Sequence, residues 1–155
     1  MIDKGKKSVL GVLIDAVDLE AAVARIAEAA KAQRPYGVTA LAVHGVMTGV
    51  ADGEHLWRLN HLDLVVPDGQ PVRWALNLLH KVGLPDRVYG PRMMLEVCKV
   101  AEKENLPIFL YGSRPELLER LQANLKGRFP GLKIAGALPS KFRRLSLEEQ
   151  LQLAQ

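Results

Sequence analysis

The chain contains a single cysteine, Cys98, so it can form no disulfide bond within itself. Small secreted proteins depend on such bonds, and their absence favours a reducing compartment. The cysteine shares a helical spacing with Met94, Val97 and Ala101, which predicts that it packs on the buried side of a helix. A catalytic thiol is the alternative. The cysteine count therefore excludes a disulfide-stapled fold and favours a cytoplasmic protein.

Long apolar stretches are also missing. The uncharged run at 36–51, which only Pro35 extends, is shorter than the roughly 20 apolar residues of a membrane-spanning helix. The N-terminus lacks the apolar core and the small-residue cleavage site of a signal peptide. With 48% hydrophobic and 25% charged residues, the composition is that of a globular protein. We expect one domain over residues 1–155, located in the cytoplasm.

Motifs for metals and dinucleotides are absent too. The histidines at 44, 55, 61 and 80 do not have the spacing of metal ligands, and no cysteine pair accompanies them. Neither the Gly-x-Gly-x-x-Gly fingerprint nor the P-loop pattern occurs. We therefore expect no metal site and no cofactor, and we reject an NAD-dependent oxidoreductase. The net charge of +4 is dispersed, so a phosphorylated ligand, an acidic membrane surface and nucleic acid all remain open as partners.

What the chain does have is a regular alternation of apolar runs and helical patterns, without repeats or linkers. Strands are expected at 8–14, 38–43, 64–66, 108–111 and 132–135. Helices are expected from Leu19 to Ala30 after an Asp18 N-cap, within 46–60, at 70–80, at 91–105, and after Pro115 with Leu117, Leu118, Leu121 and Leu125 on its apolar face. This alternation predicts an α/β fold with a mostly parallel sheet, flanked by helices.

A capping-box pattern stands near the end of the chain, where Ser146 is followed three residues later by Glu149. It predicts a new helix, but only residues 147–155 follow the cap, which makes the helix marginal unless it packs against something. We therefore expect a fold truncated at its C-terminus, and Leu151 as a position that favours self-association into a homo-oligomer. The basic cluster at 141–144 is interpreted as a solvated loop rather than as a lipid anchor.

The most informative segment is LDLVVPDGQPV at 62–72, in which an apolar run ends in Pro67, Asp68 and Gly69. In open α/β folds ligands bind at the C-terminal ends of the strands, so Asp68 is a candidate functional carboxylate. The same three residues are also ordinary turn formers, because proline fixes φ and glycine accepts a positive φ. From these residues alone both interpretations stay open.

Two glycine-containing turns are candidates for binding phosphate. Gly112 and Ser113 lie between an expected strand and a helix, where free N–H groups and the positive helix end can face an anion. Arg87, Gly90 and Arg92 precede another helix and can offer guanidinium groups and a close backbone approach. Simple turn geometry and solvated surface arginines are the respective alternatives.

A histidine provides the last candidate. His44 and Gly45 follow the second expected strand, on what should be the same edge of the sheet as Asp68. The imidazole could donate a hydrogen bond to a sugar or a phosphate. A lone histidine with a structural role is the alternative.

Taken together, these segments resemble the WecG/TagA/CpsF family of glycosyltransferases. The resemblance covers nearly the whole chain and depends on the order of the motifs rather than on any one of them. The motifs are VLGVLID at 9–15, VHGVM at 43–47, LNHLDLVVPDG at 59–69, RVYGP at 87–91, IFLYGS at 108–113 and RFPGLKIAG at 128–136. The resemblance implies a Rossmann-like sheet and a bacterial enzyme of surface polysaccharide or teichoic acid synthesis.

The resemblance also implies a reaction. An N-acetylhexosamine would pass, with inversion, from a UDP-sugar to a polyprenyl-diphosphate-linked acceptor, at the inner face of the cell membrane and without nucleic acid or cofactor. Asp68 would be the base, and the departing UDP would be met by the candidates named above. Many family members carry Thr-x-Asn where this chain has Ala42, Val43 and His44, and the family pattern continues with a basic C-terminal extension. The alternative is a non-catalytic relative that binds nucleotide sugars or a partner protein.

Overall fold

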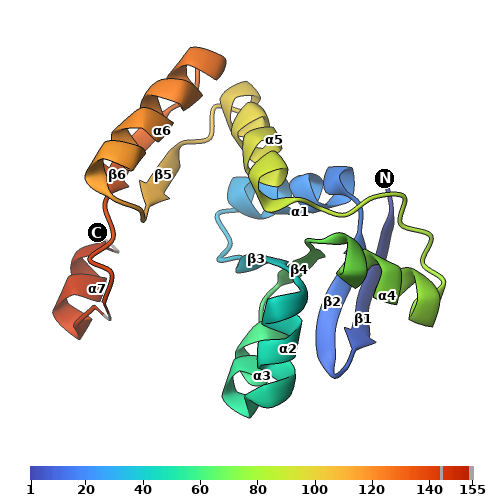
Figure 1. Ribbon diagram of the computed structural model, residues 1–155. Helices are drawn as coiled ribbons and strands as arrows, with labels where there is room; N and C mark the ends of the chain where they lie inside the picture. The colour runs from blue at the N-terminus through green and yellow to red at the C-terminus, as the bar shows by residue number, and fades with distance from the viewer. Residues whose placement is uncertain (144, 154–155) are drawn as a thin grey trace. The chain divides into compact units, whose positions relative to one another are not determined.

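The computed structural model describes residues 1–143 and 145–153, with side chains through residue 151. Arg144 of the basic cluster and the last two residues of the expected final helix lie outside this part. The chain falls into two compact units, Met1–Val97 and Cys98–Gln155 (Figure 1). The single domain expected over residues 1–155 stays a prediction, and the two units are described in turn.

The first unit contains two strand pairs and the helices around them. Its elements are β1 (Asp3–Val9), β2 (Val12–Val17), α1 (Leu19–Lys31), β3 (Val38–Leu41), α2 (Val43–Ala51), α3 (Gly53–Asn60), β4 (Leu64–Pro67), α4 (Gln70–His80) and the first part of α5 (Gly90–Lys103). Strands β1 and β2 are antiparallel, whereas β3 and β4 are parallel. The α/β class expected from the alternation of patterns is confirmed.

The prediction of a single strand at residues 8–14 is wrong, because these residues belong to two strands and the turn between them. Leu10 and Gly11 both have positive φ, 54° and 88°, and form the turn of a β1–β2 hairpin. Positive φ at both central residues is the geometry of the type I′ turn, which suits the twist of paired strands. Strand β1 is rich in lysine and largely exposed, so it carries little of the apolar signal that identifies a strand.

A buried carboxylate ties the two strand pairs together. Asp15 of β2 is 1% exposed, and its Oδ2 accepts the backbone N–H of Val65 in β4 at 2.8 Å. Its Oδ1 accepts a hydrogen bond from Nη1 of Arg25 in α1, at 2.9 Å. The Nε of Arg25 donates to the hydroxyl of Tyr36, ahead of β3. Strand β4 is thereby fixed beside β2 by a side chain, and one ion pair links β2, α1 and β4.

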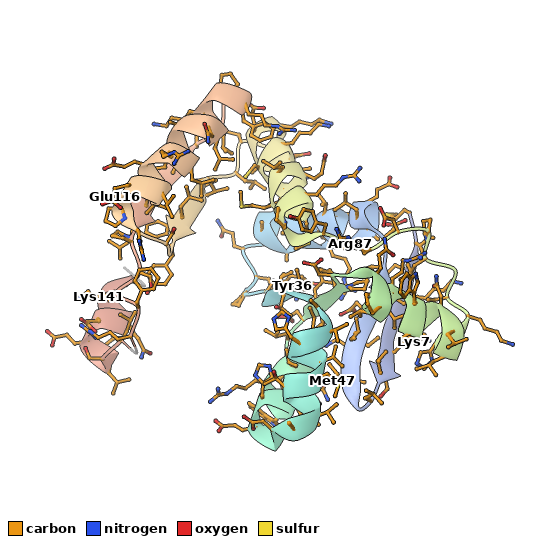
Figure 2. All side chains as sticks on the ribbon, in the orientation of Figure 1. Lys7, Tyr36, Met47, Arg87, Glu116 and Lys141 are labelled. Atoms are coloured by element: carbon orange, nitrogen blue, oxygen red, sulfur yellow. The ribbon has the colours of Figure 1, made fainter. Side chains whose placement is uncertain are left out.

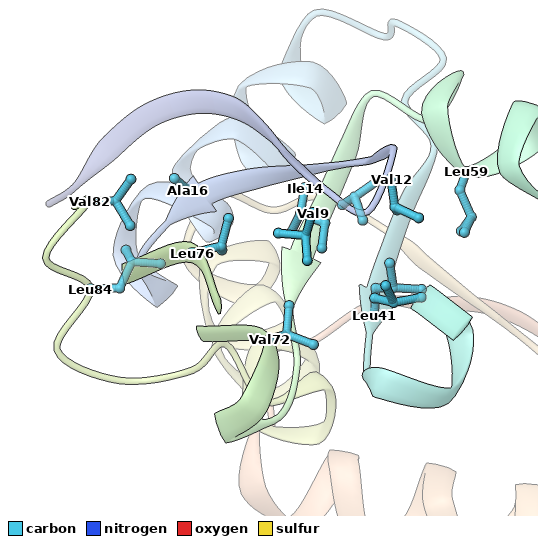
Figure 3. Close-up of a cluster of buried hydrophobic side chains, with 12 residues drawn as sticks. Val9, Val12, Ile14, Ala16, Leu41, Leu59, Val72, Leu76, Val82 and Leu84 are labelled. Atoms are coloured by element: carbon cyan, nitrogen blue, oxygen red, sulfur yellow. The ribbon is translucent and has the colours of Figure 1, made fainter. Parts of the chain in front are cut away.

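Two apolar clusters cover opposite faces of these strands. In β4, Val65 belongs to one cluster, whereas Leu64 and Val66 belong to the other, as the alternation of a strand requires. The first cluster packs the strands against α2, α3 and α4 (Figure 3). The second packs them against α1 and the start of α5. The unit is therefore a layer of strands between two layers of helices, in which strand ends and helix starts meet at the edges.

The second unit contains the rest of α5, β5 (Ile108–Tyr111), α6 (Pro115–Arg128), β6 (Ile134–Leu138) and α7 (Leu147–Leu153). Strands β5 and β6 are parallel. The expected apolar face of α6 is only partly right, because Leu118 and Leu125 are buried but Leu117 is 50% exposed. The expected buried stripe of α5 also needs correction, since Cys98 and Ala101 are buried whereas Met94 is exposed.

Two local predictions are confirmed in this unit. Ser146 and Glu149 form the expected capping box, in which the Ser146 N–H donates to Glu149 Oε2 and the Glu149 N–H donates to the serine Oγ. Cys98 is 3% exposed, and burial raises the pKa of its thiol. A buried thiol with a raised pKa packs as a small apolar group.

Throughout the described residues, no helix is long and apolar enough to cross a membrane.

Candidate functional site

The carboxyl ends of β3 and β4 lie side by side and define the candidate site. Leu41 pairs with Pro67 at the last step of the parallel register, and the N–H of Asp68 donates to the Leu41 carbonyl at 3.0 Å. Asp68 is therefore the first residue beyond β4, and Ala42 is the first residue beyond β3. The chain turns into a helix after each strand.

Three helices begin at this edge. Helix α2 has Ala42 as its N-cap, and α4 has Gly69 as its N-cap. A side chain at Gly69 would place its Cβ 3.9 Å from the Cβ of Ala42, so these two starts are neighbours. Helix α5 begins at Gly90, whose N–H donates to Asp68 Oδ2 at 3.4 Å. Three positive helix ends thus lie at this edge, and the start of α5 contacts the Asp68 carboxylate.

Apart from Asp68 itself, which accepts the Gly90 N–H at the start of α5, few groups offset the positive charge of these helix ends. No side chain in the described part of the chain caps the start of α2 or α4, and neither these helices nor α5 has an acidic residue in its first turn. The other helices each have an acidic residue in the first turn, namely Glu20 in α1, Glu54 in α3, Glu116 in α6 and Glu148 in α7. Because first-turn carboxylates offset the positive end of a helix, the edge around Asp68 is the part of the first unit best suited to an external anion.

The Asp68 side chain is 20% exposed and lies between a helix start and an arginine. Nη1 of Arg87 is 3.9 Å from Asp68 Oδ1, while the other carboxylate oxygen accepts the Gly90 N–H. The φ of 104° at Gly69 makes glycine the residue suited to this turn. The carboxylate is thus partly screened yet reachable from solvent, which is what a group that exchanges protons with a ligand requires.

Arg87 lies in the loop 81–89 between α4 and α5 and is labelled in Figure 2. Its Cζ is 4.9 Å from the centre of the Tyr89 ring, a cation–π arrangement, and its side chain is 39% exposed. The loop is fixed to the end of β4 by the N–H of Val88, which donates to the Pro67 carbonyl at 2.9 Å. Tyr89 is a neighbour of the site that the sequence interpretation missed, although its place two residues after Arg87 was a usable signal.

The structure places His44 and Gly45 in the first turn of α2 rather than at the end of a strand. His44 is exposed, and its carbonyl accepts a hydrogen bond from the Thr48 hydroxyl. Gly45 is buried, and a Cβ there would lie 2.6 Å from a methyl carbon of Leu41. Packing of α2 on β3 therefore accounts for the glycine. Ligand contacts by His44 and Gly45 stay predictions, and the helix itself offers no acceptor for their N–H groups.

The remaining candidates lie at two other helix starts. Arg92 is exposed in the first turn of α5, two residues after Gly90. Gly112 and Ser113 belong to the second unit and both have positive φ, 123° and 62°. The N–H of Gly112 donates to the Leu138 carbonyl, and the Ser113 carbonyl accepts the N–H of Ser140. The structure thus brings Asp68, Gly69, Arg87 and Gly90 together, while the part of Gly112 and Ser113 in ligand binding stays a prediction.

Within the described residues, no group of three or more histidine, cysteine, aspartate or glutamate side chains is arranged to hold a metal ion. The groups that contact the Asp68 carboxylate are instead Arg87 and the N-terminus of α5. Such groups bind phosphate oxygens through N–H donors. The arrangement defines an α/β protein with one carboxylate at an edge suited to anions.

Comparisons with known proteins give the family. Residues 7–155 match the glycosyl transferase WecG/TagA/CpsF family, and the chain belongs to it. A relative from Bacillus subtilis (strain 168), N-acetylglucosaminyldiphosphoundecaprenol N-acetyl-beta-D-mannosaminyltransferase, is 28% identical over 87 residues. This alignment covers 56% of the present chain and 34% of the relative, so the chain spans about a third of that protein's length. The resemblance expected from the ordered motifs is confirmed.

Proposed function

We propose that the protein is a glycosyltransferase that moves an N-acetylhexosamine from a UDP-sugar to a polyprenyl-diphosphate-linked acceptor in bacterial surface polysaccharide or teichoic acid synthesis. The observation that carries the proposal is the Asp68 carboxylate, which lies beside Arg87 where three helices begin. Family membership supports the reaction class. The name of the Bacillus relative, which specifies a lipid-diphosphate acceptor and a mannosaminyl group, supports the substrate classes.

The diphosphate of the donor fits the positive groups at this edge. Arg87 and Arg92 supply guanidinium groups, and the first turns of α2 and α4 supply backbone N–H groups that no acidic residue of those turns offsets. Nη1 of Arg87 lies 3.9 Å from Asp68 Oδ1. This contact is long enough for the arginine to turn to a diphosphate without losing a close ion pair.

The chemical step needs a base and a stabilised leaving group. The acceptor hydroxyl oxygen attacks the anomeric carbon as the bond from that carbon to the UDP oxygen breaks, which inverts the configuration. Asp68 takes the proton of the hydroxyl, and UDP leaves with the bonding electron pair. The negative charge that grows on UDP is met by Arg87 and by the helix N-termini. The acceptor's lipid would place this reaction at the inner face of the cell membrane, with the protein bound peripherally.

The first test is a calorimetric titration of the 155-residue chain with UDP-N-acetylmannosamine, UDP-N-acetylglucosamine, UDP and NAD. We expect binding of UDP and a UDP-sugar but not of NAD. Arg87→Ala should weaken UDP binding by about 10- to 100-fold, the effect of losing a charge-assisted hydrogen bond. The matched control is Arg58→Ala, because Arg58 is an exposed arginine of α3 that pairs with Glu54, and it should leave affinity unchanged. A folded chain without selective UDP binding would contradict the donor site.

A second candidate function is a non-catalytic relative that binds nucleotide sugars or a partner protein. The observation that favours it is the apolar outer stripe of α2, where Val43, Met47 and Val50 are 42%, 50% and 48% exposed. Contiguous exposed apolar surface often marks a protein interface. Light scattering over a wide concentration range distinguishes the outcomes: self-association that Met47→Lys abolishes would favour a homo-oligomer, and a monomer at every concentration would count against one.

A further inference from the structure

The loop that carries Arg87 is held to helix α4 by side chains of that helix. Nη1 of Arg73 donates to the carbonyls of Leu84 and Pro85, at 3.0 and 3.1 Å. Asn77 exchanges two hydrogen bonds with the backbone of Leu84, at 2.8 and 2.9 Å. These bonds satisfy backbone groups that a helix or strand would otherwise satisfy. The loop 81–89 therefore has a defined path over α4.

A chain of side-chain hydrogen bonds continues from Arg73 to the backbone of Arg87. Nε of Arg73 donates to Gln70 Oε1 at 2.8 Å, and Gln70 Nε2 donates to Asp86 Oδ1 at 3.2 Å. The same Asp86 oxygen accepts the N–H of Arg87 at 2.8 Å. The Arg87 N–H, then the Gln70 amide and the nearby arginines, lower the pKa of the Asp86 carboxyl, so it stays an anionic acceptor at neutral pH.

The Arg87 side chain has much weaker contacts of its own. It lies 3.9 Å from Asp68 and stacks over the exposed ring of Tyr89. A half-exposed arginine with such contacts loses side-chain rotamer freedom when it binds a ligand, and a mobile backbone would add a second entropic cost. The network from Arg73 fixes that backbone. The network starts on α4, the helix that immediately follows Asp68 and Gly69. One helix therefore fixes the positions of both the Asp68 carboxylate and the Arg87 backbone.

We propose that Gln70, Arg73 and Asp86 are positioning residues that orient Arg87 toward the diphosphate of the donor. The three side chains bind no ligand themselves and act through the Arg87 backbone. This inference rests on the proposed function, because it takes Arg87 as a diphosphate ligand. It adds three residues that were not among the candidates named from the sequence, and each of their hydrogen bonds can be removed separately by substitution.

The test is a double-mutant cycle between Asp86 and Arg87, with the UDP dissociation constant measured by calorimetry on the full chain. Asp86→Ala should weaken UDP binding by about fivefold to tenfold in the wild-type background, less than Arg87→Ala, because the guanidinium group stays and only its orientation is lost. It should have no further effect in the Arg87→Ala background. Asp86→Asn keeps an oxygen that can accept the Arg87 N–H, and it should restore most of the affinity. Gln70→Ala should act in the same direction as Asp86→Ala.

The matched control is Asp63→Ala, because Asp63 is another exposed aspartate that accepts a backbone N–H, that of Gly37. It should leave UDP affinity unchanged. In a transfer assay, the positioning variants should raise the KM for the UDP-sugar more than they lower kcat. A loss of affinity by Asp86→Ala that is equal in both backgrounds, or no loss at all, overturns the inference while Arg87 keeps its role. No effect of Arg87→Ala itself overturns both the inference and the donor site.

Discussion

The N–H of Gly90 donates to Oδ2 of Asp68 at 3.4 Å, so helix α5 begins directly against the candidate base. A Cβ at position 90 would lie 3.2 Å from the Cβ of Ala40 in β3 and 3.6 Å from the same carboxylate oxygen. The glycine thus allows a helix start, a strand and a carboxylate to approach one another closely. Its place in the segment RVYGP therefore has a packing reason.

Gly90→Ala should therefore destabilise the protein and disturb the site. The added methyl group meets a strand residue that cannot move freely, so we expect a loss of about 1 to 3 kcal/mol in the free energy of unfolding. UDP affinity should fall with it, because α5 shifts away from Asp68. Urea denaturation and calorimetry measure the two effects. Gly53→Ala is the control, since a Cβ there meets nothing within 4 Å, and unchanged stability in both variants would show that position 90 has room for a side chain.

Segments with strong local signals were predicted almost to the residue. Helix α4 has the expected bounds 70–80, because Gly69 and Pro71 mark its start and the apolar period is regular. Strand β5 also has its expected bounds, between Pro107 and Gly112. The β1–β2 hairpin was missed because Leu10 and Gly11 lack the usual Asn-Gly signature. Local chemistry therefore predicts an element when its ends and its period agree.

The site was predicted as separate pieces rather than as an arrangement. Asp68 and Arg87 were each candidates, but the sequence has no local signal for the 3.9 Å between them. That distance depends on non-local bonds, such as the Val88 N–H to the Pro67 carbonyl. The link from Gln70 to Asp86 was missed for the same reason, since it spans 16 residues across a helix and a loop. Contacts of this kind follow from tertiary packing, which periodicity does not encode.

The buried ion pair of Asp15 and Arg25 gives a second prediction. Asp15→Ala leaves the buried Val65 N–H without its acceptor and removes the close partner of Arg25, whose side chain is 28% exposed, so we expect about 2 to 4 kcal/mol of destabilisation. Asp3→Ala is the matched control, because Asp3 contacts the same arginine at 3.7 Å but is 42% exposed. An exposed pair of this kind contributes about 0 to 1 kcal/mol. Equal losses in urea denaturation of the two variants would contradict the structural role of Asp15.

The capping box predicts a pH dependence in helix α7. Hydrogen bonds from Arg143, Lys141 and the Ser146 N–H lower the pKa of Glu149 well below its usual value of 4.5. Because the pKa of this carboxyl is lower in the folded than in the unfolded protein, the ionised group stabilises the fold at pH values above its unfolded pKa. This stabilisation is lost as the pH falls through the folded pKa. We therefore expect the amide of Ser146, which donates to the Glu149 carboxylate, to be protected from exchange at neutral pH, and its protection factor (the ratio of intrinsic to observed exchange rate) to fall in acid. Glu149→Ala, which removes the acceptor, should show no such protection at either pH, and a protected Ser146 amide in that variant would argue against the cap.

Asp68→Asn separates binding from chemistry and is the most direct test of the base. The asparagine oxygen can still accept the Gly90 N–H, and loss of the negative charge frees Arg87 for the diphosphate. UDP affinity should therefore stay within about threefold of wild type or increase. Transfer to a lipid-diphosphate acceptor should fall by about 10²- to 10⁴-fold, because asparagine cannot take the proton of the acceptor hydroxyl. Asp63→Asn, at an exposed aspartate outside the site, should keep both properties. If Asp68→Asn transferred sugar at a rate near that of the wild type, another group or water would have to be the base, and the carboxylate at the end of β4 would serve only to hold α5 in place.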